Sequence, residues 1–263
     1  MSFRLQIIGG GNMGEALLRG LLKNNWSSED ELHVVEPVSE RRDYLAATIP
    51  GISISEEPLS ELDSLIAVKP DKVSEALEVL SKLNPARVLS IAAGVKVSSI
   101  EKILGENVRV LRAMPNTPAL IGKGSAGVAA GSSATDEDLI WAVEILSAVG
   151  SAMVVEESQL DAVTGLSGSG PAYLFFLAEA LIDAGYEVGL SKDEAKSLVE
   201  QTLLGAAALL YESDDPAEVL RQKVTSKGGT TAAAIEVFEN ASFREIIRAA
   251  VFAATERSLQ LGD

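Results

Sequence analysis

Residues 5–14 read Leu-Gln-Ile-Ile-Gly-Gly-Gly-Asn-Met-Gly, and this stretch decides the fold of the N-terminal part. The apolar run Leu5–Ile8 leads directly into a G-x-G-x-x-G motif, and a helical pattern follows over Glu15–Lys23. In this context the glycines permit a tight turn, a close approach of pyrophosphate to the backbone, and close helix–strand packing. The helix N-terminus adds free N–H groups that attract phosphate. We therefore predict a dinucleotide site, with a glycine turn that binds nothing as the alternative. Gly9, Gly11 and Gly14 fill the three roles of the glycines in that order.

The N-terminal part alternates short β-rich runs with helical stretches. The further β-rich runs are His33–Glu36, Leu65–Val68, Val88–Ala92, Val108–Ala113 and Met153–Val155. Helical patterns cover Lys72–Leu83 and Ser98–Leu104, and the small-residue run Gly122–Ala134 is expected to form a strand and a loop. Parallel strands need long crossovers, so this alternation predicts an α/β fold, a Rossmann domain with a doubly wound, mostly parallel sheet over residues 1–157.

The remainder, residues 158–263, is predicted to form an all-α domain. Three cap residues each precede a Glu by three positions: Ser191 before Glu194, Asp215 (followed by Pro216) before Glu218, and Ser242 before Glu245. The segments Leu203–Tyr211 and Ile246–Ala254 are apolar nearly all round, and such helices must be buried on several sides. An intimate dimer would bury them.

Composition restricts the possible partners. The 263 residues carry 22 Lys and Arg against 38 Asp and Glu, a net charge of −16, and there is no Cys. Nucleic acid and anionic membrane both require a positive surface, so neither is an expected partner. The chain has no signal-peptide pattern and no long apolar span, and its lack of Cys fits a reducing compartment. We expect a cytoplasmic protein with no metal site.

The end of the second β-rich run bears on the choice of cofactor. Glu36 is placed to accept a hydrogen bond from a ribose 2′-hydroxyl, and it would repel a 2′-phosphate. That favours NADH over NADPH. Arg41 and Arg42 follow closely, and they either serve a 2′-phosphate or are solvated helix residues. The only histidine, His33, is interpreted as structural.

Two glycine-rich clusters in the helical part have a functional character. The first, Gly165–Tyr173, opens a long helix that is expected to run to about Ala184. The second, Val224–Thr231, ends one helix and starts another. Hydroxyl and N–H groups at this helix start can bind a carboxylate. A plain helix–helix turn with a Thr cap explains the same residues equally well.

Together these motifs resemble the pyrroline-5-carboxylate reductase family, and the resemblance covers the full length of the chain. The residues that carry it are IIGGGNMGEAL at 7–17, AVKP at 67–70, SIAAG at 90–94, RAMPNTP at 112–118, GSGPAY at 168–173 and VTSKGGTT at 224–231. The last three in this order are specific together. The resemblance implies a Rossmann domain followed by a helical dimerisation domain, and reduction of 1-pyrroline-5-carboxylate to L-proline by NAD(P)H. It also implies a homodimer or a ring of dimers.

The resemblance further implies roles for individual residues. Thr231 would hydrogen-bond the ring nitrogen, and Lys69 would act beside it in the catalytic site, with a solvated lysine as the competing interpretation. The substrate carboxylate would be held by Ser226, Gly228, Gly229 and Thr230. The cofactor would contact Glu36 and a set of residues after later strands, and its pyrophosphate would be wrapped by the glycine turn, that is by Gly9, Gly11, Asn12, Met13 and Gly14. That set is Val68, Lys69, Pro70, Ala93, Met114, Pro115 and Asn116.

Two positions depart from the family pattern. Glu36-Pro37 stands where many members have Asn-Arg, so the cofactor preference is not carried over. Lys227 stands where Pro is common, and it either adds charge beside the carboxylate site or points to solvent.

Three rival functions compete with that of a reductase. A β-hydroxyacid dehydrogenase would need a lysine in Gly170–Ala180, and there is none. An imine reductase of broader range is compatible with the motifs. A non-catalytic dinucleotide sensor is disfavoured because the cluster from Ser226 to Thr231 is intact.

Overall fold

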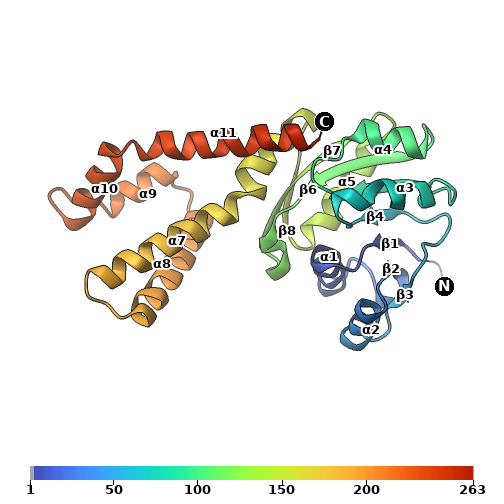
Figure 1. The fold of residues 1–263 in the computed structure, drawn as a ribbon, viewed down its shortest axis with the longest axis horizontal. Helices are drawn as coiled ribbons and strands as arrows, with labels where there is room; N and C mark the ends of the chain where they lie inside the picture. The colour runs from blue at the N-terminus through green and yellow to red at the C-terminus, as the bar shows by residue number, and fades with distance from the viewer. Residues whose placement is uncertain (1–2, 263) are drawn as a thin grey trace. The chain divides into compact units, whose positions relative to one another are not determined.

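The computed structural model describes residues 3–262, and its first compact unit is built on one eight-stranded sheet (Figure 1). The strand order is β3-β2-β1-β4-β5-β6-β7-β8, and every neighbouring pair is parallel except β6 and β7. The strands are β1 Leu5–Ile8, β2 Leu32–Val35, β3 Ser53–Ser55, β4 Ser64–Ile66, β5 Arg87–Ser90, β6 Arg109–Met114, β7 Gly124–Ala130 and β8 Gly150–Val154. The predicted doubly wound, mostly parallel sheet is confirmed.

Helices cover both faces of this sheet, as the alternation of strand side chains requires. Ile7 belongs to an apolar cluster with residues of α1, α2 and α5, whereas the next residue, Ile8, belongs to a second cluster with residues of α3 and α4. Val34 and Val35 divide between the two clusters in the same way. The covering helices are α1 Asn12–Lys23, α2 Ser39–Thr48, α3 Val73–Leu80, α4 Val97–Leu104 and α5 Asp136–Ser147.

The strand order reverses beside β1, and this reversal positions the site. From β1 the chain passes to β2 on one side, and it later returns to β4 on the other side. Ile7 pairs with Val34 of β2 and with Leu65 of β4. In open α/β sheets ligands bind outside the carboxyl ends of the strands at such a switch point.

The second compact unit, Gly170–Phe252, is entirely helical. Its helices are α7 Gly170–Glu187, α8 Lys192–Glu212, α9 Ala217–Lys223, α10 Thr230–Asn240 and the first part of α11 Phe243–Leu261. Helices α7 and α8 lie side by side (Figure 1), and a Cβ on Gly185 of α7 would come within 2.9 Å of the Ala195 Cβ. Small residues thus allow these two helices to approach closely.

The predicted helix caps have different outcomes. Ser191 and Glu194 form the expected reciprocal capping box at the start of α8. The N-cap of α9 is Pro216, and Asp215 instead forms an ion pair with Lys223. At the start of α11, the Glu245 N–H donates to the backbone oxygen of Ser242, and the Glu245 carboxylate accepts hydrogen bonds from Arg248.

The two compact units are divided differently from the expected boundary between residues 157 and 158. The first unit extends to Ser169 and also includes Ala253–Asp263. Helix α6, Leu160–Val163, packs on β7, where a Cβ on Gly127 would lie 3.0 Å from Val163 and 3.2 Å from Leu160. Near the end of α11, the Ser258 hydroxyl donates to Asp161 at 2.6 Å. These contacts join both segments to the sheet.

Short helical turns complete the described chain. They are η1 Glu29–Glu31, η2 Pro70–Lys72, η3 Thr117–Ile121, η4 Glu157–Gln159 and a π turn over Thr164–Gly168. Within residues 3–262, none of the helices combines the length and the apolar character that a bilayer span requires.

Candidate active site

The glycine turn between β1 and α1 has the geometry that a dinucleotide cradle needs. Gly9 has a φ of 108°, and a Cβ there would lie 2.7 Å from the Ala67 carbonyl oxygen. A Cβ on Gly14 would lie only 2.0 Å from the Gly9 oxygen, so this residue allows helix and strand to meet. A Cβ on Gly11 would meet no atom within 4 Å, which leaves open space beside the backbone at the start of α1. The chain therefore fits a pyrophosphate at Gly11.

Glu36 holds the glycine turn from the end of β2. Its side chain is buried, with the residue 7% exposed, and one carboxylate oxygen accepts the Gly10 N–H at 2.9 Å. The other oxygen accepts the Val38 N–H at 3.0 Å. A carboxylate oxygen has room for more than one hydrogen bond, so both oxygens retain acceptor capacity for a ribose hydroxyl. Glu36 thus has a structural role, and its contact with the ribose stays a prediction.

Arg41 stabilises the glycine turn, and Arg42 stabilises the turn that begins at Glu36. The interpretation of both as solvated helix residues is therefore wrong. Arg41 Nε donates to the Gly10 oxygen at 2.6 Å, and its guanidinium pairs with Glu15 at 2.5 Å. Arg42 donates to the carbonyl oxygens of Glu36 and Pro37, both at 2.8 Å. These arginines stabilise the backbone around Glu36.

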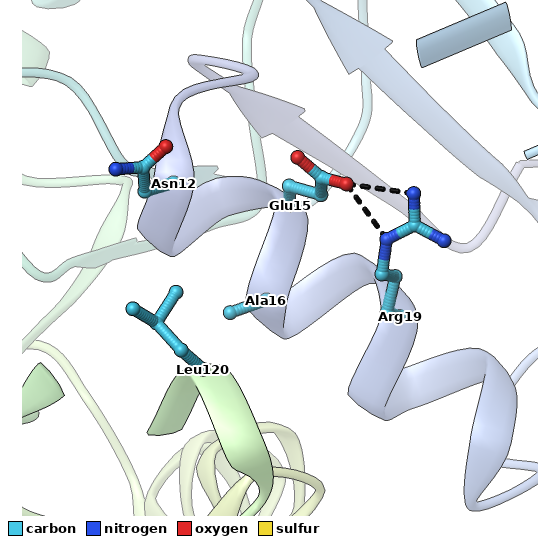
Figure 2. A pocket seen from close by; sticks show the side chains of 5 residues that line it. All are labelled: Asn12, Glu15, Ala16, Arg19 and Leu120. Carbon is cyan, nitrogen blue, oxygen red and sulfur yellow. Dashed lines mark hydrogen bonds and ion pairs between the residues drawn. The ribbon is translucent and has the colours of Figure 1, made fainter. Parts of the chain in front are cut away.

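Glu15 carries the charge that holds Arg41. Burial alone would raise the pKa of the Glu15 carboxyl, but hydrogen bonds from Arg19 and Arg41 outweigh it and lower the pKa below its usual value. Figure 2 shows the Glu15–Arg19 pair beside a pocket of about 350 Å³. This pocket is lined by Asn12, Glu15, Ala16, Arg19 and Leu120. Asn12 is the one lining residue that was predicted to bind the cofactor.

The residues predicted to surround the nicotinamide follow adjacent strands at one edge of the sheet. Val68, Lys69 and Pro70 follow β4, and Ala93 follows β5. At the end of β6 lie Met114, Pro115 and Asn116. Because β1, β4, β5 and β6 are parallel neighbours, their carboxyl ends share the edge that carries the glycine turn. Val68 touches the glycine turn, with its side chain 2.9 Å from a Cβ placed on Gly9.

Lys69 and Asn116 differ in their surroundings at this edge. Lys69 is exposed and precedes the short η2 turn. Asn116 is half-buried, and its side-chain amide donates to the Ser167 carbonyl oxygen at 3.1 Å and the Ser167 hydroxyl at 3.2 Å. Its side-chain oxygen accepts the Ser125 N–H at 2.9 Å. Ser167 was not among the predicted site residues, although it lies within the glycine-rich Gly165–Tyr173 cluster.

The proposed substrate cluster lies in the second unit, between α9 and α10. Gly229 is the N-cap of α10 and has no side-chain cap, so the alternative of a Thr cap is wrong. Gly228 has a φ of 72°, which lets the chain turn into the helix. The first N–H groups of α10 are thereby left for an anion. Thr231 is half-buried in the first turn of α10, while Ser226, Lys227 and Thr230 are exposed.

His33 lies in the sheet, on β2. It is 2% exposed, and its two ring nitrogens lie 2.9 Å from the Ser53 hydroxyl and 2.8 Å from the Ser55 hydroxyl. Burial lowers the pKa of this imidazole. These contacts support the structural role that was predicted for it.

Comparisons with known proteins agree along the whole chain. A family model described as pyrroline-5-carboxylate reductase dimerisation matches residues 157–261, and one described as NADP oxidoreductase coenzyme F420-dependent matches residues 4–94. The chain is 42% identical over 266 residues to the pyrroline-5-carboxylate reductase of Synechocystis sp., covering 100% of this chain and 99% of that relative.

Solved structures give the same result. A pyrroline-5-carboxylate reductase from Coxiella burnetii superposes with a TM-score of 0.93 and 34% identity, covering 100% of both chains. The Plasmodium falciparum pyrroline carboxylate reductase, solved with NADP bound, has a TM-score of 0.85 and 30% identity, covering 99% of this chain and 98% of the other. The chain therefore belongs to the pyrroline-5-carboxylate reductase family.

Proposed function

We propose that the chain catalyses the NAD(P)H-dependent reduction of the cyclic imine 1-pyrroline-5-carboxylate to L-proline, the last step of proline biosynthesis. The observation that carries this proposal is the 42% identity to a pyrroline-5-carboxylate reductase over the whole chain. That match spans both the glycine turn and the Val224–Thr231 cluster. The bound nicotinamide supplies a hydride, so the protein must mainly align donor and acceptor.

The cofactor is proposed to lie along the carboxyl edge of the sheet. Its pyrophosphate would face Gly11 and the N-terminus of α1, where free N–H groups and the helix dipole favour negative charge. The nicotinamide end would lie near the turns after β4, β5 and β6. The residues there are Val68, Lys69, Pro70, Ala93, Met114, Pro115 and Asn116. The positive potential at the N-terminus of α1 allows a chain of net charge −16 to bind this polyanion.

The substrate is proposed to bind at the start of α10. Its carboxylate would accept hydrogen bonds from the N–H groups and hydroxyls of Ser226, Gly228, Gly229 and Thr230. The Thr231 hydroxyl would hydrogen-bond the ring nitrogen, which must carry a proton for the C=N carbon to accept hydride readily. The hydride forms the new C–H bond, the C=N π electrons become the nitrogen lone pair, and the protonated imine becomes the secondary amine. Lys69, the second catalytic candidate, adds positive charge near the nicotinamide.

NADH is the proposed cofactor in preference to NADPH. The buried Glu36 carboxylate stands at the end of β2, where it would accept a ribose hydroxyl and repel a 2′-phosphate. Arg41 and Arg42 already bind Glu15 and backbone carbonyls, which supports this preference. The relative from Plasmodium falciparum, in contrast, was solved with NADP bound.

A homodimer is proposed as the active assembly, in the cytoplasm. The second unit exposes large apolar side chains, such as Phe175 at 65% and Phe176 at 74%, which a partner would bury. Others in this unit are Leu174, Leu204, Leu209, Tyr211 and Phe252. The match of residues 157–261 to a dimerisation family supports an interface between copies of the chain. Light scattering after gel filtration distinguishes a dimer from a ring of dimers.

The reaction is tested by following nicotinamide absorbance at about 340 nm with 1-pyrroline-5-carboxylate, using NADH and NADPH in parallel. We expect oxidation that depends on the imine and is faster with NADH at low cofactor concentration. Cofactor binding without turnover would contradict the proposal and support a dinucleotide sensor. Equal turnover of larger cyclic imines would instead indicate a reductase of broader range.

A further inference from the structure

The Gly165–Tyr173 cluster has no role in the proposed reaction, yet its backbone is unusual. After α6 the chain forms a π turn over Thr164–Gly168, closed by a hydrogen bond from Ser169 N to the Thr164 oxygen at 2.8 Å. Helix α7 then begins at Gly170. π turns are rare, and those that occur are often found at functional sites. This one ends where the chain passes from the first compact unit to the second, between Ser169 and Gly170.

The sequence of the cluster leaves one backbone carbonyl without its usual partner. In an α-helix the Ser167 oxygen would accept the N–H four residues later, but that residue is Pro171, which has no N–H. A half-buried carbonyl without a donor is costly. Asn116 supplies a donor, since its Nδ2 lies 3.1 Å from the Ser167 oxygen.

Asn116 is itself fixed in place by the sheet. It directly follows Pro115 at the end of β6, and its Oδ1 accepts the Ser125 N–H of β7 at 2.9 Å. Beside it, a Cβ on Gly168 would lie 2.9 Å from the Met114 Cε, so the π turn packs closely against the end of β6. Both polar atoms of the Asn116 side chain therefore have partners within the chain.

We propose that Asn116 is a positioning residue instead of the direct cofactor contact that the family resemblance implies: its amide holds the π turn, through the Ser167 carbonyl, against the end of β6. This inference rests on the proposed function, because the end of β6 is where the nicotinamide is proposed to bind. Without this hydrogen bond the π turn could shift against Met114, which lies among the residues proposed to surround the nicotinamide. Alignment errors of about 1 Å can slow a reaction by about 100-fold.

The test compares Asn116→Ala with a matched variant, Asn24→Ala. Asn24 also donates its Nδ2 to a backbone carbonyl, that of Ala148 at 2.8 Å, but it lies at the end of α1 away from the π turn. We expect Asn116→Ala to lower kcat by about tenfold or more and to leave the Kd of the cofactor within about twofold. Asn24→Ala should leave kcat within about twofold. A tenfold rise in cofactor Kd with an unchanged kcat would show that Asn116 contacts the cofactor instead.

A double variant separates positioning from plain structural support. Asn116→Ala with Pro171→Ala gives the Ser167 carbonyl an in-helix donor at residue 171, which should restore the Tm lost in Asn116→Ala. Positioning predicts that kcat stays low, because the connection to β6 is still missing. Recovery of kcat together with Tm would overturn the proposal.

Hydrogen exchange tests the connection independently of turnover. Asn116→Ala should speed amide exchange in residues 165–170 relative to the Asn24→Ala control. Unchanged exchange there would contradict the proposal. A wild-type chain that lacks imine-dependent turnover would contradict the proposed function, while exchange would still decide whether Asn116 holds the π turn.

Discussion

Replacing Glu36 by glutamine is expected to shift the cofactor preference away from NADH. The carboxylate is buried at the end of β2, and the amide that replaces it has no charge to repel a 2′-phosphate. A hydrogen bond between the ribose hydroxyl and a charged acceptor contributes about 1.5–3 kcal/mol. The ratio of the NADH and NADPH dissociation constants should therefore change by about 10- to 100-fold.

The same substitution has a cost in stability that the structure defines. The two Glu36 oxygens accept the N–H groups of Gly10 and Val38, at 2.9 and 3.0 Å. Glutamine keeps one acceptor oxygen. The NH2 group that replaces the other oxygen cannot accept the second backbone N–H. Losing one charge-assisted hydrogen bond should lower the Tm by roughly 3–10 °C. Cofactor titrations should therefore be carried out at a temperature well below the Tm of the variant.

Fluorescence titration with each cofactor measures the two dissociation constants. Glu40→Gln is the matched control, because it removes the same charge from an exposed residue of the neighbouring helix α2. Its preference should equal that of the wild type. If Glu36→Gln also kept the wild-type preference, the reasoning would be refuted, and Arg41, Arg42 or the backbone would decide the choice.

Substitutions at Thr231 and Gly11 test the remaining parts of the site, and a substitution at His33 tests the interior of the sheet. Thr231→Ala should lower kcat at least about tenfold, since it removes the hydrogen bond to the reacting nitrogen, whereas Thr231→Ser should retain most of the activity; equal kinetics would exclude that role. Gly11→Ala places a methyl group in open space, so the Tm should hold while cofactor Kd rises about tenfold or more; unchanged binding would remove the pyrophosphate from Gly11. Because burial lowers the pKa of His33, the unfolded chain binds the proton more readily, and stability should fall as pH drops below about 6.5. His33→Asn should flatten this part of the Tm–pH curve, and an unchanged slope would assign it to other groups.

The buried strands were predictable from the sequence because burial on both faces of the sheet leaves short, mostly apolar runs, and the glycine turn was predictable from its motif. The run Leu5–Ile8 coincides with β1, and Gly122–Ala134 contains β7. In contrast, β3 at Ser53–Ser55 is half-buried and has one apolar residue, so it leaves no run to detect. Helix α5 was also missed, since its capping box pairs Thr135 with Asp138 instead of the usual Glu or Gln.

The bracing of the site was not predictable, because it joins residues that are distant in sequence. Arg41 reaches the Gly10 carbonyl, and Asn116 reaches Ser167, through contacts that no local periodicity encodes. The glycine-rich segments did mark one residue of each pair, Gly10 in the first and Ser167 in the second. Pro171 is the signal that was available for the second pair, since it removes the N–H that the Ser167 carbonyl would use.

The most direct test of the central claim follows the hydride itself. The chain is incubated with 1-pyrroline-5-carboxylate and NADH that carries deuterium at the transferring position, and the product is analysed by mass spectrometry. We predict L-proline with one deuterium at the former imine carbon, and loss of this product in Thr231→Ala to about a tenth of the wild-type rate. Oxidised cofactor without labelled proline would contradict the assignment of this chain as a reductase of the cyclic imine.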